Sequence, residues 1–473
     1  MLFNSIDFLF FFLCVYLVYL YLGHKAQNRM LLVSSYLFYG SWNWKFLSLI
    51  LISTGVDYFC GKEIFRRINC NQRRFFLLIS ILTNLGILGF FKYYNFFSES
   101  LASLLGTMGW HMNFTTLNVI LPVGISFYTF QTMSYSIDIY RGKIKPEYNV
   151  FDFALYVAYF PQLVAGPIER AKRLLPQLIN PRTISKEDIS EGLWLIVFGY
   201  FQKVFIADNL AKIVDTAFSA SAVLSGIEYL VAVYAFAFQI FCDFAGYSSI
   251  AIGISRLMGI RLMTNFLYPY FTTNPRDFWR NWHISLSTWL RDYLYIPLGG
   301  NRKSKLNMYR NMMITMVLGG LWHGAAWTYV IWGFYHGILL VIHRFIKDHV
   351  LFQLPQGLKK DLLTFVKVII MFHLACLGWL FFRAQSLSQA WQILYSMMTN
   401  FYYPGVPVVY SFYQIIFYTW LLLFIQMIQK IRDHEMGILH LPLQWRSCLI
   451  VGVLFFIIIF GEFKSEAFIY FQF

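Results

Sequence analysis

The chain has 473 residues, of which 58% are hydrophobic and only 13% are charged, whereas a soluble domain carries about 25% charged residues. This composition excludes a soluble enzyme and indicates an all-α protein that crosses a membrane many times, in contact with its lipid. The formal net charge of +15 is explained by basic cytoplasmic loops. No basic helix or nucleic-acid motif accompanies that charge, so no nucleic acid partner is expected.

The first predicted element is a transmembrane helix over residues 7–23. The segment before it lacks the positive charge of a signal peptide, and no small-residue cleavage site follows it. Residues 30–60 are predicted to form two shorter helices that turn at Gly40–Asn43. Further apolar runs satisfy or approach the length of a span, about 20 residues, at 75–91, 115–138, 190–210, 227–254, 361–382, 407–428 and 447–462.

Basic clusters and charge-poor gaps alternate along the chain. Lys and Arg gather at 25–29, 62–74 and 141–186, and they are absent from 93–140, 213–255 and 384–429. Because cytoplasmic loops carry the excess of Lys and Arg, the gaps are predicted to face outward and the N-terminus to lie outside. We expect about eleven or twelve spans in one domain over 1–473, with peripheral N-terminal helices at 1–110 and a core at 115–473.

Two segments do not behave as simple spans. Phe151–Ala165 is apolar but has basic sequence on both sides, so it is predicted to re-enter the membrane without crossing it. Phe271–Arg302 mixes Arg and Asp with tryptophans. Such backbone survives at membrane depth only where protein or a water-filled cavity surrounds it. Both segments are therefore predicted to wall a central tunnel, which an aromatic content of 20% also favours.

A histidine lies inside the next predicted hairpin. Asn311–Ile342 contains no Asp, Glu, Lys or Arg, yet it holds His323 and His336. If Asn311–His323 is helical, it reaches about 20 Å into the membrane at 1.5 Å per residue. An ionisable residue at that depth is costly and indicates a functional site.

Each candidate residue also has a structural interpretation. His323 fits either a catalytic role or a hydrogen bond between helices. His283, one turn after Arg280, also fits an interfacial amphipathic helix. For His336 and His373 we expect packing roles, and for Asp243 a salt bridge to a nearby Arg.

The reactive groups that other enzyme classes use are not apparent in the sequence. The cysteines show no C-x-x-C pair, so neither a zinc site nor a disulfide framework is expected. No G-x-S-x-G elbow, P-loop or G-x-G-x-x-G occurs. A histidine that acts as general base on a substrate hydroxyl is therefore the economical mechanism.

Several motifs in the chain resemble those of one family. In order, they are LPVGISFYTFQ (121–131), YFPQLVAGPIER (159–170), FCDFAGYS (241–248), FWRNWHISL (278–286), YIPLGGNR (295–302) and GLWHGAAW (320–327). Together they resemble the membrane-bound O-acyltransferase (MBOAT) family. The aromatic ending FIYFQF (468–473) is similar to the branch of alginate O-acetyltransferase membrane subunits.

The resemblance implies the site and the reaction. His323 is expected to be the principal catalytic residue and His283 a second one, supported by Asn281, Trp322, Asp243 and Arg280. As general base, His323 would help move an acetyl group from cytoplasmic acetyl-CoA toward hydroxyls of an extracytoplasmic polysaccharide such as alginate. His283 or Asn281 would hydrogen-bond the developing oxyanion. No tightly bound cofactor and no metal are expected, and the location implied is the bacterial inner membrane.

Other functions remain open. Within the enzyme class, the acyl group could be D-alanyl and the acceptor another cell-wall polymer or peptidoglycan. A transporter or flippase with proton-relaying histidines is the alternative outside it, although repeat symmetry between halves is not apparent. The outward segments 93–112, 213–226 and 384–406 carry no recognisable glycan-binding module. We therefore expect a separate extracytoplasmic acetyltransferase to act as partner and to reach the polysaccharide.

Overall fold

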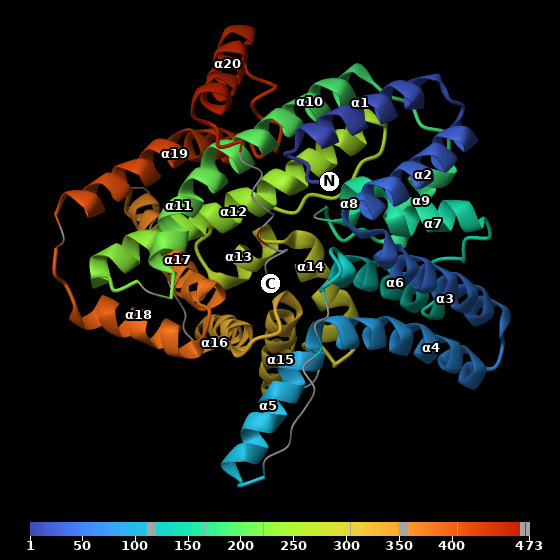
Figure 1. Cartoon of the computed structure of the whole chain (residues 1–473), viewed down its shortest axis with the longest axis horizontal. Helices are drawn as coiled ribbons and strands as arrows, with labels where there is room; N and C mark the ends of the chain where they lie inside the picture. The colour runs from blue at the N-terminus through green and yellow to red at the C-terminus, as the bar shows by residue number, and fades with distance from the viewer. Residues whose placement is uncertain are drawn as a thin grey trace. The chain divides into compact units, whose positions relative to one another are not determined.

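The structure is a computed structural model that describes residues 1–110, 117, 120–164, 166–220, 222–302, 304–349, 358–403, 405–463 and 469. All of the regular elements in these ranges are helices (Figure 1), as the sequence predicted. Seven helices among them are long and apolar enough to cross a membrane. The chain divides into two compact units, Met1–Leu193 with Ala251–Met263, and Trp194–Ile250 with Thr264–Phe473. The count of eleven or twelve spans and the single domain stay predictions.

The first unit consists of short and medium helices. They are α1 (Ile6–Tyr21), α2 (His24–Asn43), η1 (Trp44–Phe46), α3 (Leu47–Arg66), α4 (Cys70–Leu88), η2 (Gly89–Tyr93), α5 (Tyr94–Thr107), α6 (Ile125–Tyr140), α7 (Val150–Ala158), α8 (Phe160–Leu163), α9 (Ala171–Ile179) and the start of α10 (Lys186–Tyr200). The two helices predicted over residues 30–60 are present, but the turn predicted at Gly40–Asn43 comes later: α2 continues through Asn43, and the chain turns at η1. At that turn the Asn43 side chain accepts a hydrogen bond from the Lys45 N–H, which starts η1.

The segment predicted to re-enter the membrane is broken. Asn149 caps α7 by accepting from the Phe151 N–H, and α7 ends at Ala158. Pro161 follows at the start of α8. Helices of this length reach about 14 Å or less at 1.5 Å per residue, which is short of the ~30 Å hydrocarbon core. The segment therefore does not form one spanning helix. Ala165 lies outside the described residues.

Several buried polar groups of the first unit are paired. In its interior, the Asp57 carboxylate accepts hydrogen bonds from the Ser80 and Ser136 hydroxyls and from the Asn84 amide, which ties α3 to α4 and α6. Such bonds offset the cost of removing a polar group from water. At the start of α10, Ser185 and Asp188 form a reciprocal capping box.

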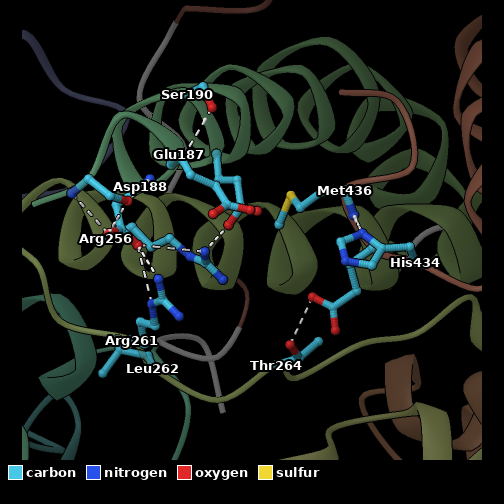
Figure 2. Close-up of polar contacts among 12 residues, drawn as sticks. Glu187, Asp188, Ser190, Arg256, Arg261, Leu262, Thr264, His434 and Met436 are labelled. Atoms are coloured by element: carbon cyan, nitrogen blue, oxygen red, sulfur yellow. Dashed lines mark hydrogen bonds and ion pairs between the residues drawn. The ribbon is translucent and has the colours of Figure 1, made fainter. Parts of the chain in front are cut away.

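Ion pairs hold the end of α12 (Gly226–Leu257) against the start of α10 within the first unit. Asp188 lies 2.9 Å from Arg261, and Arg256 pairs with Glu191 and more weakly with Asp188. Figure 2 shows the side chains of Asp188, Arg256 and Arg261 close to one another. These pairs fix the end of α12 and the residues after it to the start of α10.

The second unit carries the longer apolar helices. Besides the end of α10 and most of α12, it contains η3 (Phe201–Ala207), α11 (Asp208–Ala217), η4 (Pro269–Phe271), α13 (Pro275–Asn281), α14 (Ile284–Leu290), η5 (Arg291–Tyr295), α15 (Lys305–His323), α16 (Trp327–His349), α17 (Leu358–Arg383), α18 (Leu387–Thr399), α19 (Val406–Ile431) and α20 (Leu443–Phe460). The predicted hairpin around His323 is confirmed as α15 and α16, which pack against each other.

Glycines allow the two arms of this hairpin to approach closely. A Cβ added at Gly320 would collide with the carbonyl oxygen of Tyr329, and it would lie 3.1 Å from the Cα of Gly333. A Cβ at Gly333 would in turn collide with the carbonyl oxygen of Met316. The backbones of α15 and α16 therefore touch, where side chains would normally separate two helices. This contact fixes the position of His323, at the end of α15, relative to α16.

We predict that Gly320→Ala destabilises the protein, because the methyl group meets backbone that cannot move aside. Forcing extra volume into packed structure costs typically ~1–3 kcal/mol. The measurement is the melting temperature of the purified protein in detergent. Gly86→Ala is the matched control, since a Cβ on that exposed helical glycine would meet nothing within 4 Å. Equal melting temperatures for the two variants would contradict the close approach.

Candidate active site

A cavity of about 550 Å³ lies within the second unit, between α13, α14, α15 and α16. Its apolar wall includes Leu290, Met312, Met316 and Gly319, and two of its buried side chains are His323 and Trp332. Its exposed rim is basic, with Arg276, Arg280, Arg291 and Lys347 on the surface and Arg344 half-buried. The cavity thus joins a positively charged opening to a buried imidazole.

His323 is the last residue of α15 and is only 3% exposed. Aromatic rings pack around its imidazole. The centroids of Trp322 and Trp332 both lie 5.0 Å from the imidazole centroid, and that of Phe382 lies 5.4 Å away, all in edge-on contact. These rings restrict the orientation of the imidazole and surround it with apolar atoms, which favours its neutral form.

His283 and His323 lie forty residues apart in sequence, and the fold brings them together. Their ring centroids are 6.3 Å apart, and Trp322 contacts both rings. His283 has φ 43°, a left-handed backbone between α13 and α14. A residue other than glycine in this region costs of order 1–3 kcal/mol, and such strain clusters at functional sites. The turn directs the imidazole into the interior, where it contacts Phe244 at 4.6 Å.

The supporting residues named from the sequence take different places. Arg280 lines the cavity with an exposed guanidinium, 3.7 Å from Asp277. Trp322 contacts the rings of both histidines. Asn281 does not line the cavity, and its amide donates to the Asp277 carbonyl at 2.8 Å. His283 is not a lining residue either, but its ring contacts that of His323, which lines the cavity.

Asp243 belongs to a buried charge cluster outside the cavity lining. It lies 2.6 Å from Lys203 Nζ, which also contacts Asp208 at 2.8 Å. The Ile469 N–H donates to the other Asp243 oxygen at 2.7 Å. The expected Arg partner was therefore wrong. Lys203 occupies that place because η3 is wound as a π-helical turn that holds its side chain in the interior beside α12.

Lys203 was missed by the sequence reasoning, although a signal was present. It is the one Lys or Arg within the apolar run predicted at 190–210. A cation in such a run needs an anionic partner at the same depth. The run 227–254 contains two acidic residues, Glu228 at its start and Asp243 near its middle, and Asp243 was the available candidate.

Glu169 is the buried acid of the motif at 159–170 and belongs to the first unit. Its carboxylate accepts a hydrogen bond from the Met263 N–H. Burial raises its pKa from 4.5 to about 7, although Arg173 and Arg170 oppose the shift. Because the folded state then holds the proton more tightly than the unfolded state, this carboxyl lowers stability progressively as pH rises from about 4.5 to about 7.

Metal ligands do not gather in the part of the chain that the structure describes. Within those ranges, His, Cys, Asp and Glu side chains form no group of three or more that could hold a metal ion. The absence of a tightly bound cofactor stays a prediction. The cavity lining offers the imidazoles of His323 and His343, aromatic walls and a basic rim, whereas His283 is not a lining residue and contacts the His323 ring from the protein interior.

Comparisons with known proteins agree with the motifs. The model of the membrane-bound O-acyltransferase (MBOAT) family matches residues 141–383. The chain is 44% identical to "Probable alginate O-acetylase AlgI" of Pseudomonas aeruginosa over 85% of this chain and 75% of the relative. It is 37% identical to the peptidoglycan O-acetyltransferase of Helicobacter pylori, over 84% and 80% of the two chains. It is 29% identical to the teichoic acid D-alanyltransferase of Bacillus subtilis, over 57% and 70%.

We predict that Lys203→Met strongly destabilises the protein, because two buried carboxylates lose their shared ammonium group. Removing one partner of a buried ion pair costs about 3–5 kcal/mol. The matched control is Lys212→Met, whose partner Glu462 forms an ion pair with a 57% exposed lysine, worth about 0–1 kcal/mol. Thermal denaturation in detergent measures both variants, and a similar loss in each would contradict the assignment.

Proposed function

Because the chain belongs to the membrane-bound O-acyltransferase family, we propose that it moves an acetyl group from cytoplasmic acetyl-CoA toward hydroxyls of an extracytoplasmic polysaccharide such as alginate. Family membership makes it a multi-pass membrane acyltransferase. The donor, the acceptor polymer, the histidine base and the bacterial inner membrane are parts of the proposal. One observation carries it: a cavity that joins exposed basic side chains to the buried His323.

The shape of acetyl-CoA suits that cavity. Its nucleotide end carries phosphates, and its other end carries the thioester on a thin, flexible arm. Arginines bind phosphate oxygens through paired hydrogen bonds, and Arg276, Arg280 and Arg291 supply them at the rim. Because the predicted loop charges put this rim on the cytoplasmic side, the donor would enter from the compartment that holds it.

In the proposed reaction, neutral His323 accepts the proton of the acceptor hydroxyl while that oxygen attacks the thioester carbonyl. The C–S bond then breaks, and the imidazolium returns the proton to the departing thiolate. The products are an acetyl ester and the free thiol of CoA. His283, 6.3 Å from His323 between ring centroids, is proposed to donate a hydrogen bond to the developing oxyanion. The aromatic walls limit hydrolysis of the thioester by excluding water.

Two other functions compete with this proposal. Transfer of a D-alanyl group, or transfer to peptidoglycan, would use the same two histidines. Relatives named for those activities are 29% and 37% identical to this chain, respectively. Identifying the acyl group on the modified polymer separates these enzymes from one another. A transporter or flippase would leave the thioester intact, so release of free CoA thiol excludes it.

A partner protein is part of the proposal. The segments predicted to face outward are short. The helices within two of them, α5 and α18, are 14 and 13 residues long. A long hydrated polymer needs an extended polar cleft with aromatic platforms, and His323 lies in an apolar interior that such a polymer enters at high cost. We therefore propose that an extracytoplasmic acetyltransferase supplies the acceptor hydroxyl that His323 deprotonates. The acetyl ester then forms first on this partner at the outer face and is passed from it to a hydroxyl of the polysaccharide.

We predict that His323→Ala leaves the protein inserted and folded but removes acyl transfer, because the general base is lost. General-base catalysis is typically worth ~10²–10⁴-fold in rate. The measurement is CoA thiol release by membranes that contain the variant, together with ester content of the polymer. His373→Ala is the matched control: His373 is exposed on α17, where it bonds the Tyr234 hydroxyl. Near-normal transfer by a well-expressed His323→Ala protein rules out the proposed base.

A further inference from the structure

His336 is a buried histidine that the proposed reaction does not use. It lies on α16 one turn after Trp332, and its side chain is fully buried. Within the described residues, neither Nδ1 nor Nε2 has a hydrogen-bond partner. A buried polar group without a partner costs free energy, and such a group in a native interior calls for an explanation. Simple packing does not supply one, because an apolar ring would avoid the cost.

A cage of aromatic rings encloses this imidazole. Phe278 stacks on it at 6.0 Å and 4°, while Trp279 and Trp332 contact it edge-on at 5.2 and 5.0 Å. The remaining side is closed by Gly378, where a Cβ would lie 2.6 Å from Nε2. Glycine at this position therefore leaves room for the ring of His336, which any larger residue at 378 would meet.

The same cage contains two hydrogen-bond donors. The indole nitrogens of Trp279 and Trp332 are also buried and also have no acceptor within the described residues. An indole N–H can only donate, whereas a neutral imidazole offers one lone pair. The ring centroids of Trp332 and Trp279 lie 5.0 and 5.2 Å from that of His336. His336 therefore brings an acceptor next to indole N–H groups that need one.

This cage forms the back of the candidate active site. Trp279 and Trp332 both line the cavity. The centroid of the Trp332 ring lies 5.0 Å from that of His323 and 5.0 Å from that of His336. Both imidazoles therefore contact the same indole ring. Whatever fixes Trp332 also fixes the surface against which His323 packs.

We propose that His336 is a positioning residue for acyl transfer, whose ring nitrogen accepts a hydrogen bond from a cavity-wall indole and thereby holds Trp332 against His323. The inference rests on the proposed function, because it takes His323 to be the base. Its consequence is that the nitrogen atoms of His336 matter, in addition to its volume. A packing role predicts the reverse, since phenylalanine fills a similar space without a buried polar group.

The test compares His336→Phe with His336→Gln. Phenylalanine keeps the ring but removes the acceptor, whereas the glutamine amide oxygen restores an acceptor. We expect His336→Phe to fold with an unchanged or higher melting temperature and an unchanged KM for acetyl-CoA. Its kcat for CoA thiol release should fall about 10- to 100-fold, because small misplacements of catalytic groups cost up to ~10²-fold. His336→Gln should recover most of the rate.

The matched control is His373→Phe. His373 lies on α17 in the same unit, and its two nitrogens bond the Tyr234 hydroxyl and the Ile369 carbonyl. This variant loses two real hydrogen bonds, yet it should keep the parent kcat because it lies away from the cavity wall. The control separates a general effect of losing an imidazole from the positional effect of His336.

The outcomes are distinct. A folded His336→Phe protein with the parent kcat overturns the inference and leaves His336 as a packing residue. If His336→Phe does not fold, His336→Leu replaces it, and equal kcat values for the Leu and Gln variants overturn the inference. An inactive parent protein, in contrast, rejects the proposed function itself.

Discussion

The close packing of aromatic rings around His323 is the contact on which the candidate site depends. Trp322, Trp332 and Phe382 hold the imidazole from different sides. In an apolar interior these rings keep water away and leave the imidazole neutral. Both properties are what a general base acting on a thioester in a membrane requires.

Two features of the backbone permit this packing. Gly320 and Gly333 let α15 and α16 touch, and His323, the last residue of α15, contacts the ring of Trp332 on α16. The left-handed turn at His283 directs a second imidazole toward the same place. A residue with a strained backbone, such as His283, reduces stability unless the surrounding structure compensates. This residue and the close contact between the glycines of α15 and α16 both occur at the site proposed to carry the chemistry.

Other buried polar groups follow a different rule. Lys203 is surrounded by Asp208 and Asp243, and Asp57 by hydroxyl and amide donors. These groups are paired within the fold and serve its stability. Within the part of the chain that the structure describes, the ring nitrogens of His336 and the indole nitrogens of Trp279 and Trp332 have no hydrogen-bond partner. That contrast is why a role in positioning is assigned to His336 and not to the other buried polar groups.

Much of the fold could be predicted from local patterns. The hairpin at His323 was visible as a stretch without charged residues, and the break between α2 and α3 was predicted to within a few residues, at Gly40–Asn43 in place of Trp44–Phe46. The partner of Asp243 and the bond that engages Asn281 could not be predicted, since they depend on how helices rotate against each other. His336 was interpreted as packing because its unpaired nitrogens appear only when its neighbours are known. The i, i+4 spacing of Trp332 and His336 was the available signal.

The central claim is that an acyl group passes from a cytoplasmic thioester to the outer face at His323. The most direct measurement uses liposomes that contain the purified chain, with labelled acetyl-CoA enclosed and the polysaccharide outside, with and without the extracytoplasmic partner. The account predicts labelled polymer when donor, intact His323 and partner are all present, and unlabelled polymer without the partner. Full labelling of the polymer by this chain alone would contradict the relay. Labelling that occurs only with the donor outside would contradict the proposed direction of transfer.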